Sequence, residues 1–186
     1  MRIISGNFKG KKISLPKDKE TRPLRDLVKE SIFNLINHSN KINLNLENSN
    51  ILDLFAGSGS FGLECLSRGA KKVIFFENYS EALKILNKNI ELLKINQNYE
   101  IIYKDCFNYF NSNQNFLNKF DIIFVDPPYK EIKINDLISK IIEKKILKKN
   151  GIMIIHRHKN DIVEITLKLK IFENRKYGLS NIFFGN

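Results

Sequence analysis

The sequence predicts an α/β protein with a mostly parallel sheet and helices on both of its faces. Short and almost continuous apolar runs recur along the chain, as expected of strands that are buried on both faces of a sheet. Segments with the apolar spacing of a helix separate most of these runs, which is the pattern of βαβ units. The run at 51–54 also leads directly into a glycine-rich turn that opens a helical segment. Together these observations favour one parallel, doubly covered sheet.

Length and composition indicate a single domain in a reducing, cytoplasmic setting. The chain has 186 residues, of which 42% are hydrophobic, enough for a substantial core. Cys65 and Cys106 are too few for a disulfide framework, and no His/Cys cluster has zinc spacing. The N-terminus is too poor in apolar residues for a signal peptide, and no run reaches membrane length. We therefore expect a soluble protein that needs neither a metal nor a membrane.

Positive charge is concentrated at the N-terminus. The formal net charge is +11, and residues 1–25 contain eight Lys or Arg against two acidic residues. Arg2–Ser5 and Lys11–Leu15 predict two short strands of a basic β-hairpin, an extension over 1–20 on a main domain over 21–186. Phe8 at its tip could stack on a base or pack inward, and the charges could equally form an ordinary solvated face. The candidates for contacts with a nucleic acid are Lys9, Lys11, Lys12, Arg22 and Arg25.

The elements of the main domain follow in order from periodicity and from turn residues. An amphipathic segment at 24–37 predicts a helix whose inner face includes Leu27, and the asparagine-rich stretch 40–50 predicts a linker. The expected strands are 51–54, 73–77, 101–103, 120–125 and 152–155, followed by an antiparallel pair at 163–172 and 182–184. The expected helices begin at 60, and span 79–94, 106–116 and 137–147. The charged run His156–Lys159 is predicted as a solvated loop, with substrate contact as the alternative, and 175–178 as a basic turn.

The glycine-rich turn is the first candidate ligand site. Gly57, Gly59 and Gly62 satisfy G-x-G-x-x-G, and glycines allow backbone amides to approach a ligand closely. A pyrophosphate would be repelled by Asp53, whereas a cationic cofactor without phosphate, S-adenosyl-L-methionine, would be attracted. No Lys-Ser or Lys-Thr follows the glycines, which excludes a Walker loop. Asp53 as a cap of the tight turn remains the alternative. The cofactor-binding candidates here are Asp53, Phe55, Ala56, Gly57, Ser58 and Gly59.

Two further acidic residues follow strands in the same way. Glu77 ends the run at 73–77, where a carboxylate can accept hydrogen bonds from both hydroxyls of a ribose; a helix cap is the alternative. Asp105 follows the next strand, where a carboxylate can accept a hydrogen bond from the amino group of an adenine, with Cys106 beside it. Asp105 suits the N-cap of the following helix equally well.

The motif Asp126-Pro127-Pro128-Tyr129 follows the strand at 120–125. The lone pair of an aromatic amine is delocalised into the ring, so the amine is a poor nucleophile. The Asp126 carboxylate and the Pro127 carbonyl could both accept from such an amine and turn its lone pair toward a methyl group. Pro127 and Pro128 lack N–H groups and fix a rigid rim, and Tyr129 could stack on an extruded base. Asp126, Pro127, Pro128 and Tyr129 are therefore the catalytic candidates, with Asp126 also beside the cofactor and Tyr129 also beside the RNA.

With this motif, the chain resembles S-adenosylmethionine-dependent methyltransferases that act on exocyclic amines of nucleobases. Over nearly its full length it resembles the bacterial methyltransferases of guanine N2 in 16S ribosomal RNA, small-subunit guanine(966)-N2 type. The likeness rests on residues 1–6, 9–12, 21–23, 28–34, 52–70, 126–129 and 176–178. Relatives usually have threonine at the position of Leu24, arginine at that of Lys29 and acidic residues near 156–159. The resemblance implies a Rossmann-like methyltransferase fold with a seven-stranded sheet, and a monomer that methylates partly assembled small ribosomal subunits.

Other functions stay open on the motif alone. Adenine N6 is an exocyclic amine like guanine N2, so an amino-methyltransferase of DNA or of another RNA could carry the same site. Such DNA enzymes usually have a sizeable recognition domain, for which this chain has no room beyond the hairpin. A non-catalytic RNA-binding protein on a relic fold is a further alternative, against which the intact motif argues.

Overall fold

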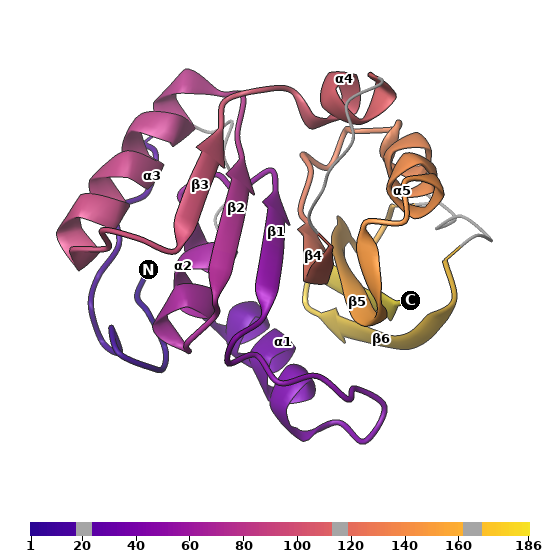
Figure 1. Ribbon diagram of the computed structural model, residues 1–186, viewed down its shortest axis with the longest axis horizontal. Helices are drawn as coiled ribbons and strands as arrows, with labels where there is room; N and C mark the ends of the chain where they lie inside the picture. Colours follow the sequence, from indigo (N-terminus) through magenta and orange to yellow (C-terminus); the bar gives the residue numbers. More distant parts are fainter. Residues whose placement is uncertain (18–23, 113–118, 162–168) are drawn as a thin grey trace.

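The computed structural model describes residues 1–17, 24–112, 119–161 and 169–186. It contains a seven-stranded sheet in the order β3-β2-β1-β4-β5-β7-β6. Figure 1 shows β3, β2, β1, β4 and β5 from left to right in this order. The strands are β1 (Asn50–Leu54), β2 (Lys72–Phe76), β3 (Tyr99–Ile102), β4 (Phe120–Val125), β5 (Leu147–His158), β6 (Ile171–Tyr177) and β7 (Ser180–Gly185). The helices are α1 (Asp26–His38), α2 (Ser60–Ser67), α3 (Ser80–Leu93), α4 (Cys106–Asn111) and α5 (Ile134–Glu143).

The strands β1 to β5 run parallel, and β7 turns back antiparallel between β5 and β6. Residues of the central strands alternate between two buried clusters, because successive side chains of a strand point to opposite faces. One cluster takes in α1, α2 and α3, and the other takes in α4 and α5. Both faces are therefore covered, which explains why the strands are almost continuously apolar.

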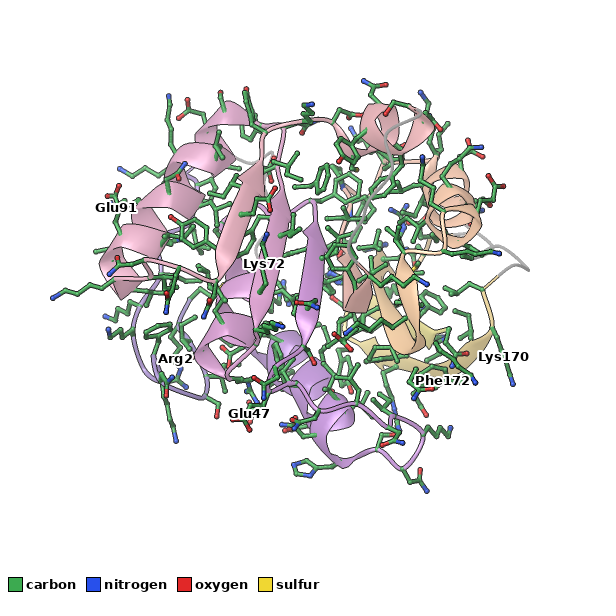
Figure 2. The ribbon with its side chains drawn as sticks, viewed as in Figure 1. Arg2, Glu47, Lys72, Glu91, Lys170 and Phe172 are labelled. Atoms are coloured by element: carbon green, nitrogen blue, oxygen red, sulfur yellow. The ribbon has the colours of Figure 1, made fainter. Side chains whose placement is uncertain are left out.

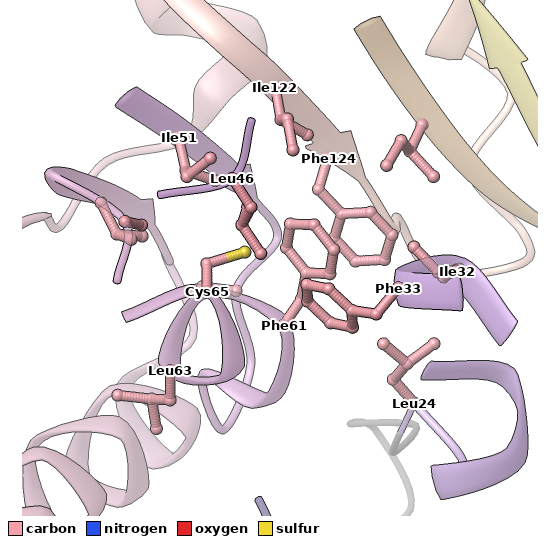
Figure 3. Packing of buried hydrophobic residues seen from close by; sticks show 14 of the residues in the cluster. Leu24, Ile32, Phe33, Leu46, Ile51, Phe61, Leu63, Cys65, Ile122 and Phe124 are labelled. Carbon is pink, nitrogen blue, oxygen red and sulfur yellow. The ribbon is translucent and has the colours of Figure 1, made fainter. Parts of the chain in front are cut away.

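Three aromatic rings form the centre of the first face. Phe61 of α2 lies between Phe33 of α1 and Phe124 of β4, with ring centroids 5.3 and 4.1 Å away. Figure 3 shows the three rings packed among aliphatic neighbours such as Leu46 and Ile122. Phe124 lies two residues before Asp126 and Phe61 directly follows the first residue of α2. The stack therefore fixes α1 and α2 against the strand that carries the predicted catalytic motif.

Residues 1–17, the described part of the basic N-terminal segment, form a short hairpin-like loop without extended strands: Arg2 and Lys12 make an antiparallel β-bridge, and the backbone of Ile3 pairs with that of Lys11 and Gly10. Its backbone is bound to α2: the amides of Ile4 and Ser5 donate to Glu64, at 2.7 and 2.9 Å. The buried ammonium group of Lys29 donates to the carbonyl of Arg2 and lies 3.5 Å from Glu64. The segment is thus held both by hydrogen bonds between its own two arms and by hydrogen bonds to the helices beneath it. Figure 2 shows Arg2 at the outer edge of this loop.

Three local expectations were wrong. In α1, Leu27 is 69% exposed and Val28 is buried, so the inner face is rotated by one residue. His156 and Arg157 lie inside β5 and are each 2% exposed, because β5 extends along β7 as far as His158. The predicted basic turn begins later, since residues 175–177 belong to β6. The first part of the predicted strand at 163–172 and the end of the helix at 106–116 fall outside the described residues.

Among the described residues, no helix is both long and apolar enough to cross a bilayer. In the same part of the chain, His, Cys, Asp and Glu side chains form no group suited to holding a metal ion.

Candidate active site

The order of the strands places the candidate residues at one edge of the sheet. β1 lies between β2 and β4. The chain therefore continues from β1 to β2 and β3 on one side, and then crosses to β4 on the other side of β1. In parallel sheets of this type, ligands bind outside the carboxyl ends of the strands at such a point. Asp53 lies in β1 near its end, whereas Glu77 and Asp126 directly follow β2 and β4. The topology therefore brings together three acidic residues that lie far apart in the sequence.

The turn after β1 has a tightly specified backbone. Phe55, Gly57 and Gly59 all have positive φ angles, of 62°, 57° and 81°. A Cβ atom at Gly59 would lie 2.4 Å from the side chain of Leu86 on α3, so the turn has room only for glycine there. A positive φ is unfavourable for a non-glycine residue such as Phe55. The centroid of the Phe55 ring lies 5.7 Å from that of Phe107. The turn thus places an aromatic ring beside the end of β1 and the N-terminus of α2 beside the glycines.

Asp53 is buried beneath this turn and caps α2. Its Oδ2 accepts a hydrogen bond of 2.9 Å from the amide of Gly62, in the first turn of a helix that lacks a side-chain cap at Gly59. Burial raises the pKa of Asp53 well above its usual range, and the nearby charges of Asp126 and Glu77 raise it further, against the hydrogen bond from Gly62. The alternative role predicted for Asp53, as a cap of the tight turn, is therefore confirmed. Its attraction for a cationic cofactor stays a prediction.

Glu77 joins two loops at this edge. Its carboxylate accepts hydrogen bonds from the amides of Gly57, Asn78 and Tyr79, at 2.6, 2.9 and 2.8 Å. A carboxylate has about four acceptor positions, so about one remains available while these three bonds persist. A ribose that binds Glu77 through two hydroxyls would have to share or displace the amide of Gly57. The predicted contact with a ribose stays a prediction.

A small hollow opens beside Glu77. It is lined by Phe55, Phe76, Glu77, Asn78, Lys104 and Cys106. Asp105 at its rim caps α4 by accepting from the amide of Asn108, and it also accepts from the side chain of Asn78 at 3.1 Å. The capping role expected for Asp105 is confirmed, whereas its contact with an adenine is untested. Cys106 is 3% exposed, and burial raises the pKa of its thiol strongly, so it contributes an apolar wall and no reactive thiolate.

The motif after β4 lies next to the glycine turn. The amide of Asp126 faces the carbonyl of Leu54, the last residue of β1, at 3.5 Å. The side chain of Asp126 is 12% exposed, and its Oδ1 lies 2.8 Å from Nδ1 of His156. Pro127 is buried, and the ring of Tyr129 is half-buried with its centroid 4.7 Å from that of His158. The motif therefore presents a partly exposed carboxylate and an aromatic ring at the rim of the same edge.

Arg157 holds the loop that follows the motif. Its guanidinium group donates to the carbonyls of Pro128, Tyr129 and Glu131, at 3.4, 3.1 and 2.9 Å. It also forms an ion pair with Asp161. Sequence reasoning treated Arg157 as a solvated charge, because nothing in a run of four polar residues shows that β5 continues through it.

The candidate RNA contacts divide into described and undescribed residues. Lys9, Lys11 and Lys12 are all exposed on the N-terminal segment, and Arg25 is exposed directly before α1. Phe8 is half-buried against the core, with the ammonium group of Lys11 5.2 Å from its ring centroid, so it packs inward. Arg22 lies outside the described residues.

Asn89, which sequence reasoning missed, connects the N-terminal segment to the glycine turn. Its side-chain amide donates to the carbonyls of Ser14 and Ser58, at 3.0 and 2.9 Å. Its oxygen accepts from the amide of Ser14 at 2.7 Å. Asn89 is fully buried on α3, so its side-chain amide has no hydrogen bonds to water, and these three hydrogen bonds take their place.

Comparison with known proteins gives this site a family. Ribosomal RNA small subunit methyltransferase D of Haemophilus influenzae is 35% identical over 161 residues, which cover 86% of this chain and 80% of that protein. HI0767 of Haemophilus influenzae, solved as a candidate methylase, superposes with a TM-score of 0.76 at 29% identity and covers 99% of this chain and 96% of its own. SMU.776, a candidate methyltransferase, was solved in complex with SAH; it superposes with a TM-score of 0.65 at 18% identity, over 83% of this chain and 48% of its own.

These likenesses confirm the expected Rossmann-like methyltransferase fold, and they support S-adenosyl-L-methionine as the cofactor. The family model described as Conserved hypothetical protein 95 matches residues 1–186, the whole chain. The protein belongs to the Conserved hypothetical protein 95 family and is a methyltransferase.

Proposed function

We propose that this protein transfers a methyl group from S-adenosyl-L-methionine to the exocyclic N2 amine of a guanine in 16S ribosomal RNA. The observation that carries the proposal is the placement of Asp126-Pro127-Pro128-Tyr129 beside the glycine turn of β1, at the carboxyl ends of adjacent strands. A relative of 35% identity is named for methylation of small-subunit ribosomal RNA. The substrate and the target atom are part of the proposal.

The residues at the strand ends fit the proposed cofactor. The hollow beside β2 offers aromatic walls, a carboxylate acceptor at Glu77 and an amide at Asn78, which are suitable partners for an adenosine group. The glycines expose backbone amides for the amino-acid end, and the acidic residues favour a positively charged ligand. The bound cofactor supplies a methyl group on a positively charged sulfur.

The motif then prepares the amine. Asp126 and the carbonyl of Pro127 accept from the two N–H bonds, which directs the nitrogen lone pair toward the methyl carbon. In this geometry the C–N bond would form as the C–S bond breaks and the sulfur leaves as a neutral thioether, and the carboxylate of Asp126 would accept the proton that leaves the nitrogen. Alignment contributes much of the acceleration, because a held geometry replaces the search of two free reactants. Tyr129, at the rim, stacks on the extruded base.

Charge supports an RNA substrate. The exposed lysines of the N-terminal segment belong to a chain with a formal net charge of +11, which favours a polyanionic partner. In this proposal the enzyme acts in the cytoplasm as a monomer on partly assembled small subunits.

The test combines labelled S-adenosylmethionine with small ribosomal subunits from a bacterial strain that lacks the relative of this protein. We expect label in a single guanine of 16S ribosomal RNA, located by fragment mass spectrometry. Asp126→Ala should abolish the transfer while cofactor affinity, measured by calorimetry, stays within about a few fold, since Asp126 contacts the amine.

Each alternative predicts a distinct result. Label in adenine, in DNA or in another RNA would replace the proposed substrate with another exocyclic amine. RNA binding without transfer of label to any of these substrates would favour a non-catalytic protein. Loss of cofactor affinity of a hundredfold or more in Asp126→Ala would contradict the assigned contact with the amine.

A further inference from the structure

His156 is a buried histidine in contact with the proposed catalytic carboxylate. It lies on β5, opposite Ile182 of β7, and is 2% exposed. Its Nδ1 lies 2.8 Å from Oδ1 of Asp126, and its Nε2 lies 2.8 Å from the hydroxyl oxygen of Ser180. Both ring nitrogens are thus engaged, one by β7 and one by the residue that ends β4.

These contacts fix where the proton of a neutral ring lies. An ionised carboxylate can only accept hydrogen bonds, so Nδ1 must donate to Asp126. Nε2 of the neutral ring then lacks a proton and accepts from the hydroxyl of Ser180. Ser180 opens β7 and pairs in register with His158, so its position is set by the sheet. The ring is therefore held in one orientation, and a neutral ring in this orientation carries its proton on Nδ1.

We propose that His156 is a positioning residue for methyl transfer: it holds one oxygen of Asp126 and thereby fixes the plane of the carboxylate that receives the amine. This inference rests on the proposed function of Asp126. A carboxylate on a short side chain can rotate about its last bond, and its hydrogen bonds to a planar amine weaken steeply with misalignment. The bond from His156 removes that rotation before the substrate arrives.

The neighbouring groups support positioning and not a direct contact with substrate. His156 is almost completely buried, whereas its direct partner Asp126 is 12% exposed. The ring of Tyr129 lies edge-on, with its centroid 6.3 Å from that of His156. The substrate therefore meets Asp126 and Tyr129, and His156 acts from behind them.

Side chains that mimic one ring nitrogen provide the test. The amide nitrogen of asparagine lies about where Nδ1 does, and that of glutamine about where Nε2 does. In single-turnover methyl transfer we expect His156→Leu and His156→Gln to lose roughly a hundredfold in rate, and His156→Asn to stay within about tenfold of the wild type. Cofactor and RNA dissociation constants should be unchanged in all three.

Met153→Ala, a buried change on the same strand, controls for lost stability and should leave the rate unchanged below its melting temperature.

Equal losses in the Asn, Gln and Leu variants, or a wild-type rate in His156→Leu, would overturn the proposal.

A second measurement does not depend on activity or on the folding of a variant. Nitrogen NMR of the imidazoles should show His156 of the wild-type protein protonated at Nδ1, and Asp126→Ala should release this preference. A wild-type ring protonated at Nε2 alone would overturn positioning by this bond. Absence of transfer by the wild-type protein would instead overturn the proposed function.

Discussion

Glu77 accepts a hydrogen bond of 2.6 Å from the backbone amide of Gly57, so the residue after β2 directly supports the glycine turn after β1. The same carboxylate accepts from the amides of Asn78 and Tyr79 and so shapes the start of α3. Glu77 is 8% exposed, and the hollow proposed for the cofactor lies beside it. One side chain thus organises both the turn and the pocket.

Glu77→Ala should weaken cofactor binding by about 1.5–3 kcal/mol, the usual contribution of hydrogen bonds to a charged group. The loss has two sources, the missing contact with the ribose and the released amide of Gly57. Calorimetry with S-adenosylmethionine measures it. Glu77→Gln keeps an acceptor for Gly57 and should lose less. An unchanged dissociation constant in Glu77→Ala would remove Glu77 from the pocket.

Asp53→Asn should change how stability depends on pH. Burial first, and then the charges of Asp126 and Glu77, raise the pKa of Asp53 in the folded protein. A raised folded pKa stabilises the fold below the unfolded value, and this stabilisation is lost as pH rises through the folded pKa. Asparagine cannot ionise, yet its oxygen can still accept from Gly62. The melting temperature of the variant, relative to wild type, should therefore increase from pH 5 to pH 8.

A difference in melting temperature that stays constant over this range would show that the pKa of Asp53 is not raised in the folded protein. Ser112→Ala, a change at a residue that does not ionise and directly follows α4, should show no such trend. Because Asp53 is predicted to attract a cationic ligand, Asp53→Asn should also weaken S-adenosylmethionine binding.

Arg157→Met should lower the rate of methyl transfer more than it weakens cofactor binding. The variant retains most of the apolar stem but loses the donors to the carbonyls of Pro128, Tyr129 and Glu131. We expect destabilisation of roughly 3 kcal/mol, since buried acceptors and Asp161 lose their charged partner. Denaturant unfolding and single-turnover kinetics measure the two effects. Arg175→Met, at an exposed position of β6, should be close to neutral; equal behaviour of the two variants would contradict the prediction.

Replacing Lys9, Lys11 and Lys12 together by alanine should weaken RNA binding and reduce its salt dependence. Each lost phosphate contact lowers the log–log slope by about one unit, so the slope should fall by up to about 3 units. Titrations at several salt concentrations measure it. The matched control replaces three other exposed lysines, Lys84, Lys88 and Lys170. If both triple variants lose the same slope, the N-terminal segment has no special place in RNA binding.

The parallel strands and the edge that carries the site followed from local signals. Apolar runs, glycines and acidic residues after strands are short-range patterns, and they located β1, β2, β4 and the motif at Asp126. The glycine turn after β1 was predictable because the backbone geometry at Gly57 and Gly59 requires glycine. Such features are encoded within a few residues.

What the sequence did not reveal depends on partners far along the chain. His156 and Arg157 are polar residues in a central strand, and they are buried because β5 pairs with β7 along its whole end. Their hydrogen-bond partners are Asp126 for His156 and the carbonyls of residues 128, 129 and 131 for Arg157, which lie far away in the sequence. Leu27 follows the apolar spacing of α1 yet is exposed, because the fold buries Val28 and Lys29 in its place. The charged Lys29 is buried since Glu64 and the carbonyl of Arg2 surround its ammonium group.

The side-chain amide of Asn89 joins the N-terminal segment to the glycine turn after β1, because it forms hydrogen bonds with both Ser14 and Ser58. A chain trimmed to remove the first fifteen residues would lose the partners of Asn89 at Ser14, and Glu64 and Lys29 would lose the backbone of residues 2–5. These polar groups are fully buried, so the trimmed protein would carry several uncompensated charges and amides in its interior. The N-terminal segment is therefore part of the folded core structure as well as a carrier of exposed positive charge.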